Sequence, residues 1–476
     1  MTATRAVKLA RAAFTCVALV VGSAVCSDLR SPDNRFDYVI VAPSAYVACA
    51  SDLARFRAAH DGFSSIVVPF DSILTQFGTC IRPDSALRAF VQCALSAWAD
   101  PKPRYFLLAG NINTIPSHYE PEQLVPPADA VYDTLWIDEW FVEGGAGPKP
   151  AVGRLPAWDL PGLGAMVSKI LRYESEGATA WSGRALCLAD YLPGDGGEFE
   201  YDARALSSVL AGGWPDTITV HVREDSPQHG DPEEFRRIWS MGTGVLVYCG
   251  HANPQELSSS NYFSCCDVDS LCNDAGLPLA LLGGCDIRFD GVCPSSIPVH
   301  LLTCGTGGAI AVVASGGLMY ESDTEPFFAA MIARMVGNPA LSAGDAFAAA
   351  KRDRGSPFIL RRYTFLGDPA IHVKQNHPVT AMRCAAAAPG RFTLGQNFPN
   401  PFNSSTTIAY VLSSASRVTL TVYDAAGQVV APLVHADQPA GRYLVRFDAS
   451  ALASGVYFYR LQSGGSVQTK RSILLR

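Results

Sequence analysis

The chain has 476 residues, of which 48% are hydrophobic and 17% are charged, so it can form sizeable packed cores and is not a mainly disordered protein. Its 37 Lys and Arg against 44 Asp and Glu give a net charge of −7 without a basic tract, which excludes nucleic acid as an expected partner. The only long unbroken apolar run lies at the N-terminus, so no later segment is predicted to span a membrane.

The first 26 residues have the three parts of an export signal. Three basic residues precede an apolar stretch at 12–21, and small residues follow it. This stretch is shorter than the roughly 20 residues of a membrane anchor. Lipid attachment at Cys26 is a further alternative, although the preceding residues match a bacterial lipoprotein signal only loosely. We therefore expect residues 1–26 to be a signal peptide that directs export through the inner membrane.

The cysteine content agrees with export. The sequence has 14 cysteines, and disulfides persist in secreted proteins but are rare in the cytosol. Three of them, Cys265, Cys266 and Cys272, lie close to His251 in the sequence and suggest a zinc site, but their spacing matches no common zinc motif. We interpret them as disulfide partners or buried thiols.

Residues 36–375 alternate short apolar runs with amphipathic segments, a pattern typical of a mostly parallel sheet covered by helices. Most of the apolar runs are rich in Val, Ile and Leu without alternation, as expected for strands buried on both faces. Apolar residues recur with helical spacing after Asp84 and from Leu163 onward, which predicts two helices there. The predicted strands are 38–41, 65–68, 105–108, 185–188, 218–222, 245–248, 277–282 and 309–314.

The composition changes after the α/β region. Residues 376–392 are rich in Ala with scattered Pro, which is typical of a linker. Residues 393–476 contain alternating apolar segments separated by turn signals, and they lack cysteine. We predict a small antiparallel, immunoglobulin-like β-sandwich there.

Several motifs in this tail occur in a fixed order. They are Gln396-Asn397-Phe398-Pro399-Asn400-Pro401-Phe402-Asn403, Thr406-Thr407-Ile408, Val422-Tyr423-Asp424, and Gly455-Val456-Tyr457-Phe458-Tyr459. With these motifs the tail resembles the C-terminal sorting domain of the type IX (Por) secretion system. The resemblance implies secretion or surface display in a two-membraned bacterium, with the outer-membrane secretion machinery as partner. A plain adhesion module is the alternative.

Two candidate catalytic residues follow predicted strands. His251 comes after the run 245–248, and Cys285 comes after the run 277–282, each with a preceding glycine. Ligands of open α/β sheets bind at the carboxyl ends of the strands, so both residues are placed for chemistry. Cys249 is expected to point to the opposite face of its strand from His251 and is a weaker candidate.

Further landmarks extend over most of residues 36–374. They are Tyr38-Val39-Ile40-Val41, Tyr105-Phe106-Leu107-Leu108-Ala109-Gly110, Ala151-Val152-Gly153-Arg154-Leu155-Pro156, Gly250-His251, Cys285 with Arg288-Phe289-Asp290, Gly307-Gly308-Ala309-Ile310-Ala311, and Leu366-Gly367-Asp368-Pro369. Together they resemble the gingipain family of secreted cysteine peptidases. The resemblance implies a caspase-like α/β fold with one subdomain at 36–155 and a second at 156–375 that carries the catalytic residues.

The resemblance also implies roles for single residues. Cys285 aligns with the nucleophile and His251 with the catalytic histidine, which gives peptide-bond hydrolysis through an acyl-enzyme. Asp159 is the available acid to orient the histidine, although a helix N-cap explains it equally well. The backbone amides of Ala252 and Cys285 would form the oxyanion hole. No cofactor is required for this chemistry, and structural calcium, present in some relatives, is not assigned to residues here.

Two positions depart from the family pattern. Ala252 stands where glycine is usual, and Gly284 stands where alanine or serine is frequent. If position 252 requires a positive φ, alanine there would strain the oxyanion hole. The sequence therefore keeps two other interpretations open: a catalytically inactive surface scaffold with this fold, and a transpeptidase that uses the same Cys and His. The substrates are expected to be proteins or peptides, and their side-chain preference is not predicted.

Overall fold

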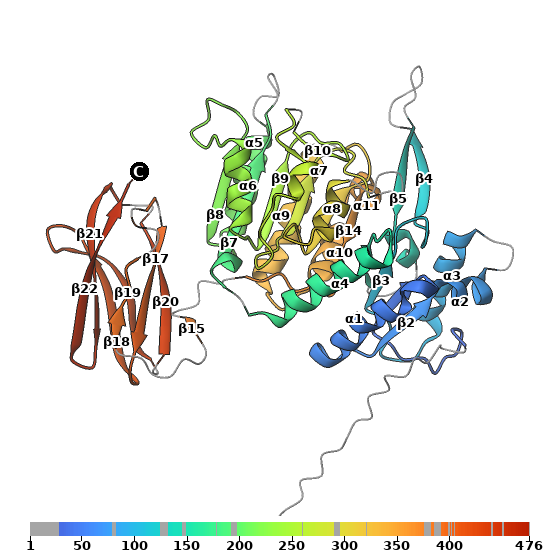
Figure 1. Cartoon of the computed structure of the whole chain (residues 1–476), viewed down its shortest axis with the longest axis horizontal. Coiled ribbons are helices and arrows are strands. Elements are labelled where there is room, and N and C mark those ends of the chain that lie inside the picture. Colours follow the sequence, from blue (N-terminus) through green and yellow to red (C-terminus); the bar gives the residue numbers. More distant parts are fainter. Residues whose placement is uncertain are drawn as a thin grey trace, which may run out of the picture.

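The computed structural model describes an α/β domain and a C-terminal β-sandwich (Figure 1). The predicted signal peptide lies outside the described residues. Within the described residues, no helix combines the length and apolar character needed to cross a bilayer. The described residues are 28–78, 82–123, 132–144, 149–177, 179–191, 198–258, 260–289, 296–319, 321–375, 382–384, 392–397, 400, 402–403, 405–438, 441–449 and 452–475.

A ten-stranded sheet forms the centre of the α/β domain. Seven of its strands are buried at every position, and burial on both faces explains the continuous apolar runs of most of them. In spatial order the strands are β2 (Ser65–Pro69), β1 (Tyr38–Ala42), β3 (Tyr105–Ala109), β6 (Ala151–Leu155), β14 (Tyr363–Leu366), β13 (Ala311–Ser315), β12 (Leu279–Gly283), β9 (Val245–Cys249), β7 (Arg184–Ala189) and β8 (Asp216–His221).

One strand, β14, joins the two halves of this sheet. It pairs antiparallel with β13 over Tyr363 to Leu366 and contacts β6 through Leu366. Directly after it, the Asp368 carboxylate accepts hydrogen bonds from Tyr38 Oη (2.9 Å) and Arg57 Nε (2.9 Å), which come from the start of the domain. The two predicted subdomains therefore share one continuous sheet.

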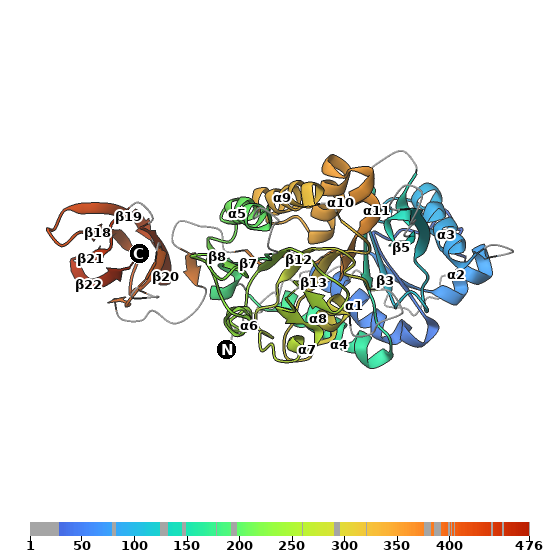
Figure 2. The same ribbon diagram turned by 90° about the horizontal axis from the view of Figure 1, so that it is seen from above.

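Helices cover both faces of the sheet (Figure 2). The predicted helices after Asp84 and around Leu163 are confirmed as α3 and α4, and their apolar stripes are buried. One face carries α1 (Val47–His60), α4 (Leu160–Ser175), α6 (Pro232–Ser240), α7 (Cys265–Val268) and α8 (Ile297–Thr303). The other carries α2 (Phe70–Phe77), α3 (Pro83–Ala97), α5 (Glu198–Leu210), α9 (Glu321–Gly337), α10 (Ala343–Arg354) and α11 (Pro357–Arg362).

A two-stranded hairpin formed by β4 (His118–Gln123) and β5 (Tyr132–Ile137) projects from the domain, and the sequence analysis did not predict it. Arg154 fastens its base: the guanidinium makes two 2.7 Å hydrogen bonds to Asp138, the residue after β5, and both side chains are buried. The remaining elements are short: η1 (Ser44–Tyr46), η2 (Glu139–Val142), η3 (Ala180–Gly183), β10 (Glu256–Leu257) and β11 (Phe263–Ser264).

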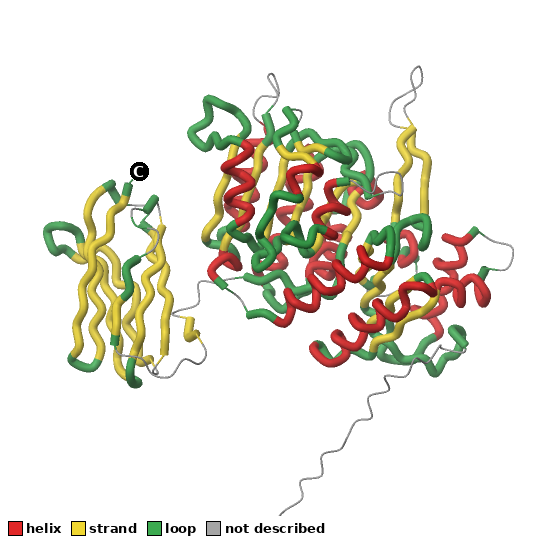
Figure 3. The backbone as a smooth tube through the Cα atoms, viewed as in Figure 1, coloured by secondary structure: helices red, strands yellow, loops and turns green. Residues whose placement is uncertain are grey.

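The C-terminal region forms two antiparallel four-stranded sheets, as the alternating pattern predicted (Figure 3). Three motif residues meet in it: the Asn397 N–H donates to Tyr459 Oη (2.7 Å), and the Asn397 side-chain amide donates to Thr406 Oγ1 (3.0 Å). Part of the predicted linker is β15, which pairs with β20. The sheets are β15 (Met382–Cys384), β20 (Gly441–Asp448), β17 (Ser405–Leu412) and β16 (Thr393–Leu394), and β19 (Val429–Gln438), β18 (Ser416–Tyr423), β21 (Gly455–Ser463) and β22 (Ser466–Leu474).

Candidate active site

His251 and Cys285 follow two neighbouring parallel strands. Strand β9 ends at Cys249 and β12 ends at Gly283, and these two residues are direct partners in the ladder. His251 and Cys285 each lie two residues beyond that pair, so the fold brings them to the same edge of the sheet, as the sequence analysis expected. Carboxyl ends of parallel strands are where α/β folds bind ligands.

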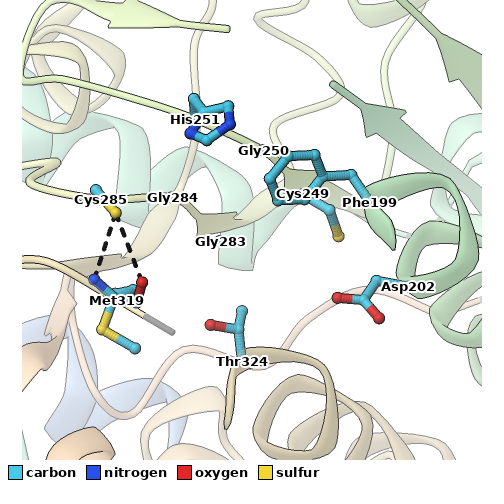
Figure 4. Close-up of a pocket in the computed structure, with 10 residues that line it drawn as sticks. All are labelled: Phe199, Asp202, Cys249, Gly250, His251, Gly283, Gly284, Cys285, Met319 and Thr324. Atoms are coloured by element: carbon cyan, nitrogen blue, oxygen red, sulfur yellow. Dashed lines mark hydrogen bonds between the residues drawn. The ribbon is translucent and has the colours of Figure 1, made fainter. Parts of the chain in front are cut away.

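Both side chains line one pocket of about 220 Å³ (Figure 4). The ring of Phe199 packs edge-on against the His251 ring, with the ring centroids 5.1 Å apart. Asp202 lies across the pocket from Cys285. The lining residues come from β9, β12, the helices α5 and α9 and the loop after β13: Phe199, Asp202, Cys249, Gly250, His251, Gly283, Gly284, Cys285, Met319 and Thr324.

The Cys285 thiol is free and half-buried, and its hydrogen-bond partner is the backbone of Met319. The Met319 N–H lies 3.4 Å from Sγ, and the thiol donates to the Met319 carbonyl over 3.7 Å. His251 and Cys285 both belong to the described residues, and no hydrogen bond joins ring and thiol. Catalytic pairs are often loose without substrate and tighten in the complex.

Close packing behind the pocket requires small residues. A Cβ on Gly250 would lie 2.2 Å from Asp190 Cβ, and a Cβ on Gly283 would lie 2.8 Å from the Tyr248 carbonyl oxygen. Such contacts are impossible without backbone movement. Gly250 therefore allows the loop after β9 to lie against the residue that follows β7, and Gly283 allows the end of β12 to lie close to β9.

The two departures from the family pattern are coupled in space. Ala252 is not among the described residues with positive φ, so its side chain causes no backbone strain. A Cβ on Gly284, however, would lie 2.7 Å from the Ala252 Cβ. The gap between the histidine loop and the cysteine loop thus has room for one methyl group, which Ala252 supplies.

The Ala252 amide remains outside the neighbouring hydrogen-bond ladder. Ala252 faces Leu257 as an antiparallel bridge, and the hydrogen bonds on either side run from Ser258 N to His251 O (2.8 Å) and from Asn253 N to Glu256 O (3.0 Å). Residues of such a non-hydrogen-bonded pair point their amides away from the partner strand. The backbone therefore leaves this N–H directed away from the hairpin.

The structure does not bring Asp159 to the pocket. Asp159 is the N-cap of α4, and its carboxylate accepts a hydrogen bond from Gly162 N (2.8 Å). It follows β6, which is four strand spacings, or roughly 19 Å, from β9, and α4 covers the opposite face of the sheet from α5 and α9. Its predicted role in orienting His251 is therefore wrong, and the N-cap alternative is correct.

A different acid, Asp190, contacts the histidine, and the sequence analysis missed it. Asp190 follows β7, the neighbour of β9, and its carboxylate accepts a 3.0 Å hydrogen bond from the His251 backbone N–H. Its position directly after an apolar run, at the same sheet edge as His251, is the signal that identifies it.

The predictions for the other cysteines were partly wrong. Cys249 lines the pocket together with His251, although it was expected to point to the opposite face of its strand. Cys266 and Cys272 are exposed free thiols, so neither is the disulfide partner or buried thiol that was expected. Among the described residues, no group of three or more His, Cys, Asp or Glu is arranged to hold a metal ion.

Asp202 gives the pocket a titratable acidic group. The pKa of Asp202 is raised to about 6. Partial burial is the main cause, and the nearby negative charges of Glu325 and Glu198 raise the pKa further. The carboxylate is thus mostly charged at neutral pH, and the described residues that line the pocket include no Lys or Arg to balance it. A positively charged guest side chain would relieve this unfavourable charge.

The fold and the pocket define a cysteine-peptidase-like α/β domain of caspase-like architecture, followed by an immunoglobulin-like β-sandwich. Residues 31–374 match the model of peptidase family C25, the gingipain family, and residues 396–475 match the secretion system C-terminal sorting domain. The chain therefore belongs to peptidase family C25, with a type IX sorting domain at its C-terminal end. The sorting domain indicates export, followed by secretion or surface attachment.

One solved structure agrees with this fold. The structure described as "Structure of Protease" has a TM-score of 0.57 and 15% identity, and the match covers 94% of this chain and 98% of that chain. The "Crystal structure of dimeric latent PorU from Porphyromonas gingivalis" has a TM-score of 0.39 and 11% identity and covers 93% of this chain and 43% of that one. Curated protein sequences give no match.

Proposed function

We propose that the protein is an exported endopeptidase in which Cys285 is the nucleophile and His251 the proton carrier. The observation that carries this proposal is the presence of both side chains in one pocket at the ends of neighbouring strands, in a chain of a cysteine peptidase family. Export would begin with the leader at residues 1–26 and end with the secretion machinery that recognises the C-terminal domain. Proteins or peptides are the substrates.

The reaction would proceed through a thioester. The Cys285 thiolate attacks the scissile carbonyl carbon, a C–S bond forms, and the carbonyl electron pair moves to oxygen. Collapse of this intermediate breaks the C–N bond, and His251 gives its proton to the departing amine. His251 then removes a proton from water, and the resulting hydroxide cleaves the thioester to a carboxylate and the free thiol.

The backbone supplies donors for the developing oxyanion. The Ala252 N–H points away from the hairpin ladder, and Cys285 carries its own amide on the adjacent loop. Two such amides bind a negative oxygen more strongly than the neutral carbonyl of the substrate, which lowers the barrier. The negative φ of Ala252 supports this assignment, since the alanine fits without strain.

The same pocket is suited to a substrate with a basic side chain on the residue before the scissile bond. The Asp202 carboxylate would bind that side chain. We expect the KM for an arginyl peptide to rise as the pH falls below about 6, because protonation of Asp202 removes the attracting charge. In Asp202→Asn the KM should be high and nearly independent of pH across this range. Steady-state kinetics over a pH series with matched arginyl and leucyl peptides measures both effects.

The exposed Asp225 provides a control, since Asp225→Asn makes the same charge change outside the pocket. This variant should keep the wild-type pH profile. Equal arginyl and leucyl KM values in the wild-type protein would contradict the assignment of Asp202.

The proposed function is tested by treating the purified mature protein with a panel of peptidyl acyloxymethyl ketones and locating the adduct by mass spectrometry. We expect labelling at Cys285 alone and its loss in His251→Ala. The best-reacting probe identifies the preferred side chain. No labelling of a reduced Cys285 would instead support the inactive scaffold, and products joined to an added amine in place of free carboxylates would support a transpeptidase.

A further inference from the structure

The backbone of His251 is held on both sides by buried polar groups that do not line the pocket. Its N–H donates to Asp190 Oδ2 (3.0 Å), and its carbonyl accepts from Tyr248 Oη and from Ser258 N (2.8 Å). Asp190, Tyr248 and Ser258 are at most 3% exposed. Both hydrogen-bonding groups of the His251 backbone are therefore occupied inside the protein.

These holding groups are also bonded to one another. The Ser258 hydroxyl donates to Asp190 Oδ1 (2.5 Å), and the Ser258 N–H lies 2.7 Å from Tyr248 Oη. Asp190 is fixed in turn by its own N–H, which donates to the Cys249 carbonyl (2.9 Å). The result is a closed network around one peptide segment, and buried polar networks of this kind define a single geometry when all members are satisfied.

Strain at Ser258 indicates that this geometry serves the site. Ser258 has a φ of 72°, in the left-handed region that serine seldom adopts. Glycine would fit that backbone better but would lack the hydroxyl that reaches Asp190. Strained residues of this kind persist where the surroundings enforce them, and they cluster at functional sites.

We propose that Asp190, Tyr248 and Ser258 form a positioning clamp that fixes the His251 backbone and thereby aims its ring at Cys285. This inference rests on the proposed function. The clamp residues do not contact substrate and act only through His251. Burial, together with the adjacent Asp190 carboxylate, raises the pKa of Tyr248, so the hydroxyl stays protonated and can donate to the His251 carbonyl.

The clamp is tested with Tyr248→Phe and Ser258→Gly in the full chain. We expect kcat to fall by about tenfold to a hundredfold in each, since small displacements of a catalytic group have effects of this size. KM should change by less than about twofold, because the lining of the pocket is intact. In Ser258→Gly the melting temperature should stay near the wild-type value, because relief of the φ strain offsets the lost hydrogen bond.

Tyr262→Phe is the matched control, because Tyr262 is also a buried tyrosine whose hydroxyl donates to a backbone carbonyl, that of Gly230. We expect it to lower stability but to leave kcat unchanged. The clamp would be overturned if the kcat of Tyr248→Phe equalled the wild-type value. It would also be overturned if that kcat fell only in proportion to the folded fraction, as in Tyr262→Phe.

A second readout does not depend on turnover. The ring resonances of His251, assigned by their loss in His251→Ala, should shift and broaden at constant pH in Tyr248→Phe relative to the wild-type protein, because the ring loses its fixed surroundings. Unchanged ring resonances together with unchanged kcat contradict the clamp alone. A wild-type protein that neither cleaves peptides nor reacts with the probes contradicts the proposed peptidase, whichever way the ring resonances behave.

Discussion

Replacement of Cys285 by alanine is expected to lower kcat/KM for peptide hydrolysis by about a thousandfold or more, because no group remains to form the acyl-enzyme. His251→Ala should cause a loss of similar size, since residues that act as a unit each remove most of the rate when deleted. The double variant should therefore be hardly worse than either single one. Fluorogenic peptide assays on the purified proteins measure all three values.

Cys249→Ala provides the control for this experiment. Cys249 lines the same pocket and is also a cysteine, so its removal tests whether any thiol in the pocket suffices. We expect at least half of the wild-type rate in this variant. If Cys249→Ala abolished hydrolysis while Cys285→Ala retained it, the roles of the two cysteines would have to be exchanged.

Gly284→Ala is expected to cause the second large loss. The added methyl group would lie 2.7 Å from the Ala252 Cβ and 2.9 Å from the Gly250 carbonyl oxygen, so the cysteine loop must move away from the histidine loop. Overpacking of this kind costs about 1–3 kcal/mol of unfolding free energy. A shift of Cys285 by about 1 Å would lower kcat/KM by about a hundredfold.

A second substitution tests the spatial explanation. Ala252→Gly removes one of the two clashing methyl groups, so the double variant Ala252→Gly/Gly284→Ala should recover activity and melting temperature relative to Gly284→Ala alone. This result would be a coupling between the two positions, measured as a double-mutant cycle. Simple additivity of the two single effects would show that the 252–284 contact does not set the spacing of the loops.

The central strands were predictable because burial on both faces leaves continuous apolar runs in the sequence. The strand β6 was missed as a strand because its segment contains Gly153 and the buried Arg154, whose charge is balanced by Asp138 from a distant turn. The strand β14 was missed because its run contains the polar Thr364, which is buried, and directly follows the two arginines that end α11. The hairpin of β4 and β5 was missed because the segment of β4 is mostly polar and includes Pro121.

The candidate site was predictable to the extent that residues follow strands. His251 and Cys285 could be located because each comes directly after an apolar run, whereas the acid could not be chosen without the strand order. Asp159 follows β6, which is not a neighbour of β9 in the sheet or along the chain. Asp190 follows β7, which lies next to β9 in the sheet. Asp202 lies on a helix, and only the packing of α5 against the strands brings it to the pocket.

The position of β14 also determines when the α/β domain can finish folding. On one side of β14 the sheet has four strands, which end at β6, and on the other side it has five, which begin at β13. The edges of β6 and β13 that face β14 stay unpaired until residues 363–366 are available to lie between them. The bonds from Tyr38 and Arg57 to Asp368 then connect residues more than 300 positions apart. Contacts of such long range form slowly. A chain still emerging from a membrane channel therefore cannot complete the sheet until nearly the whole domain has emerged.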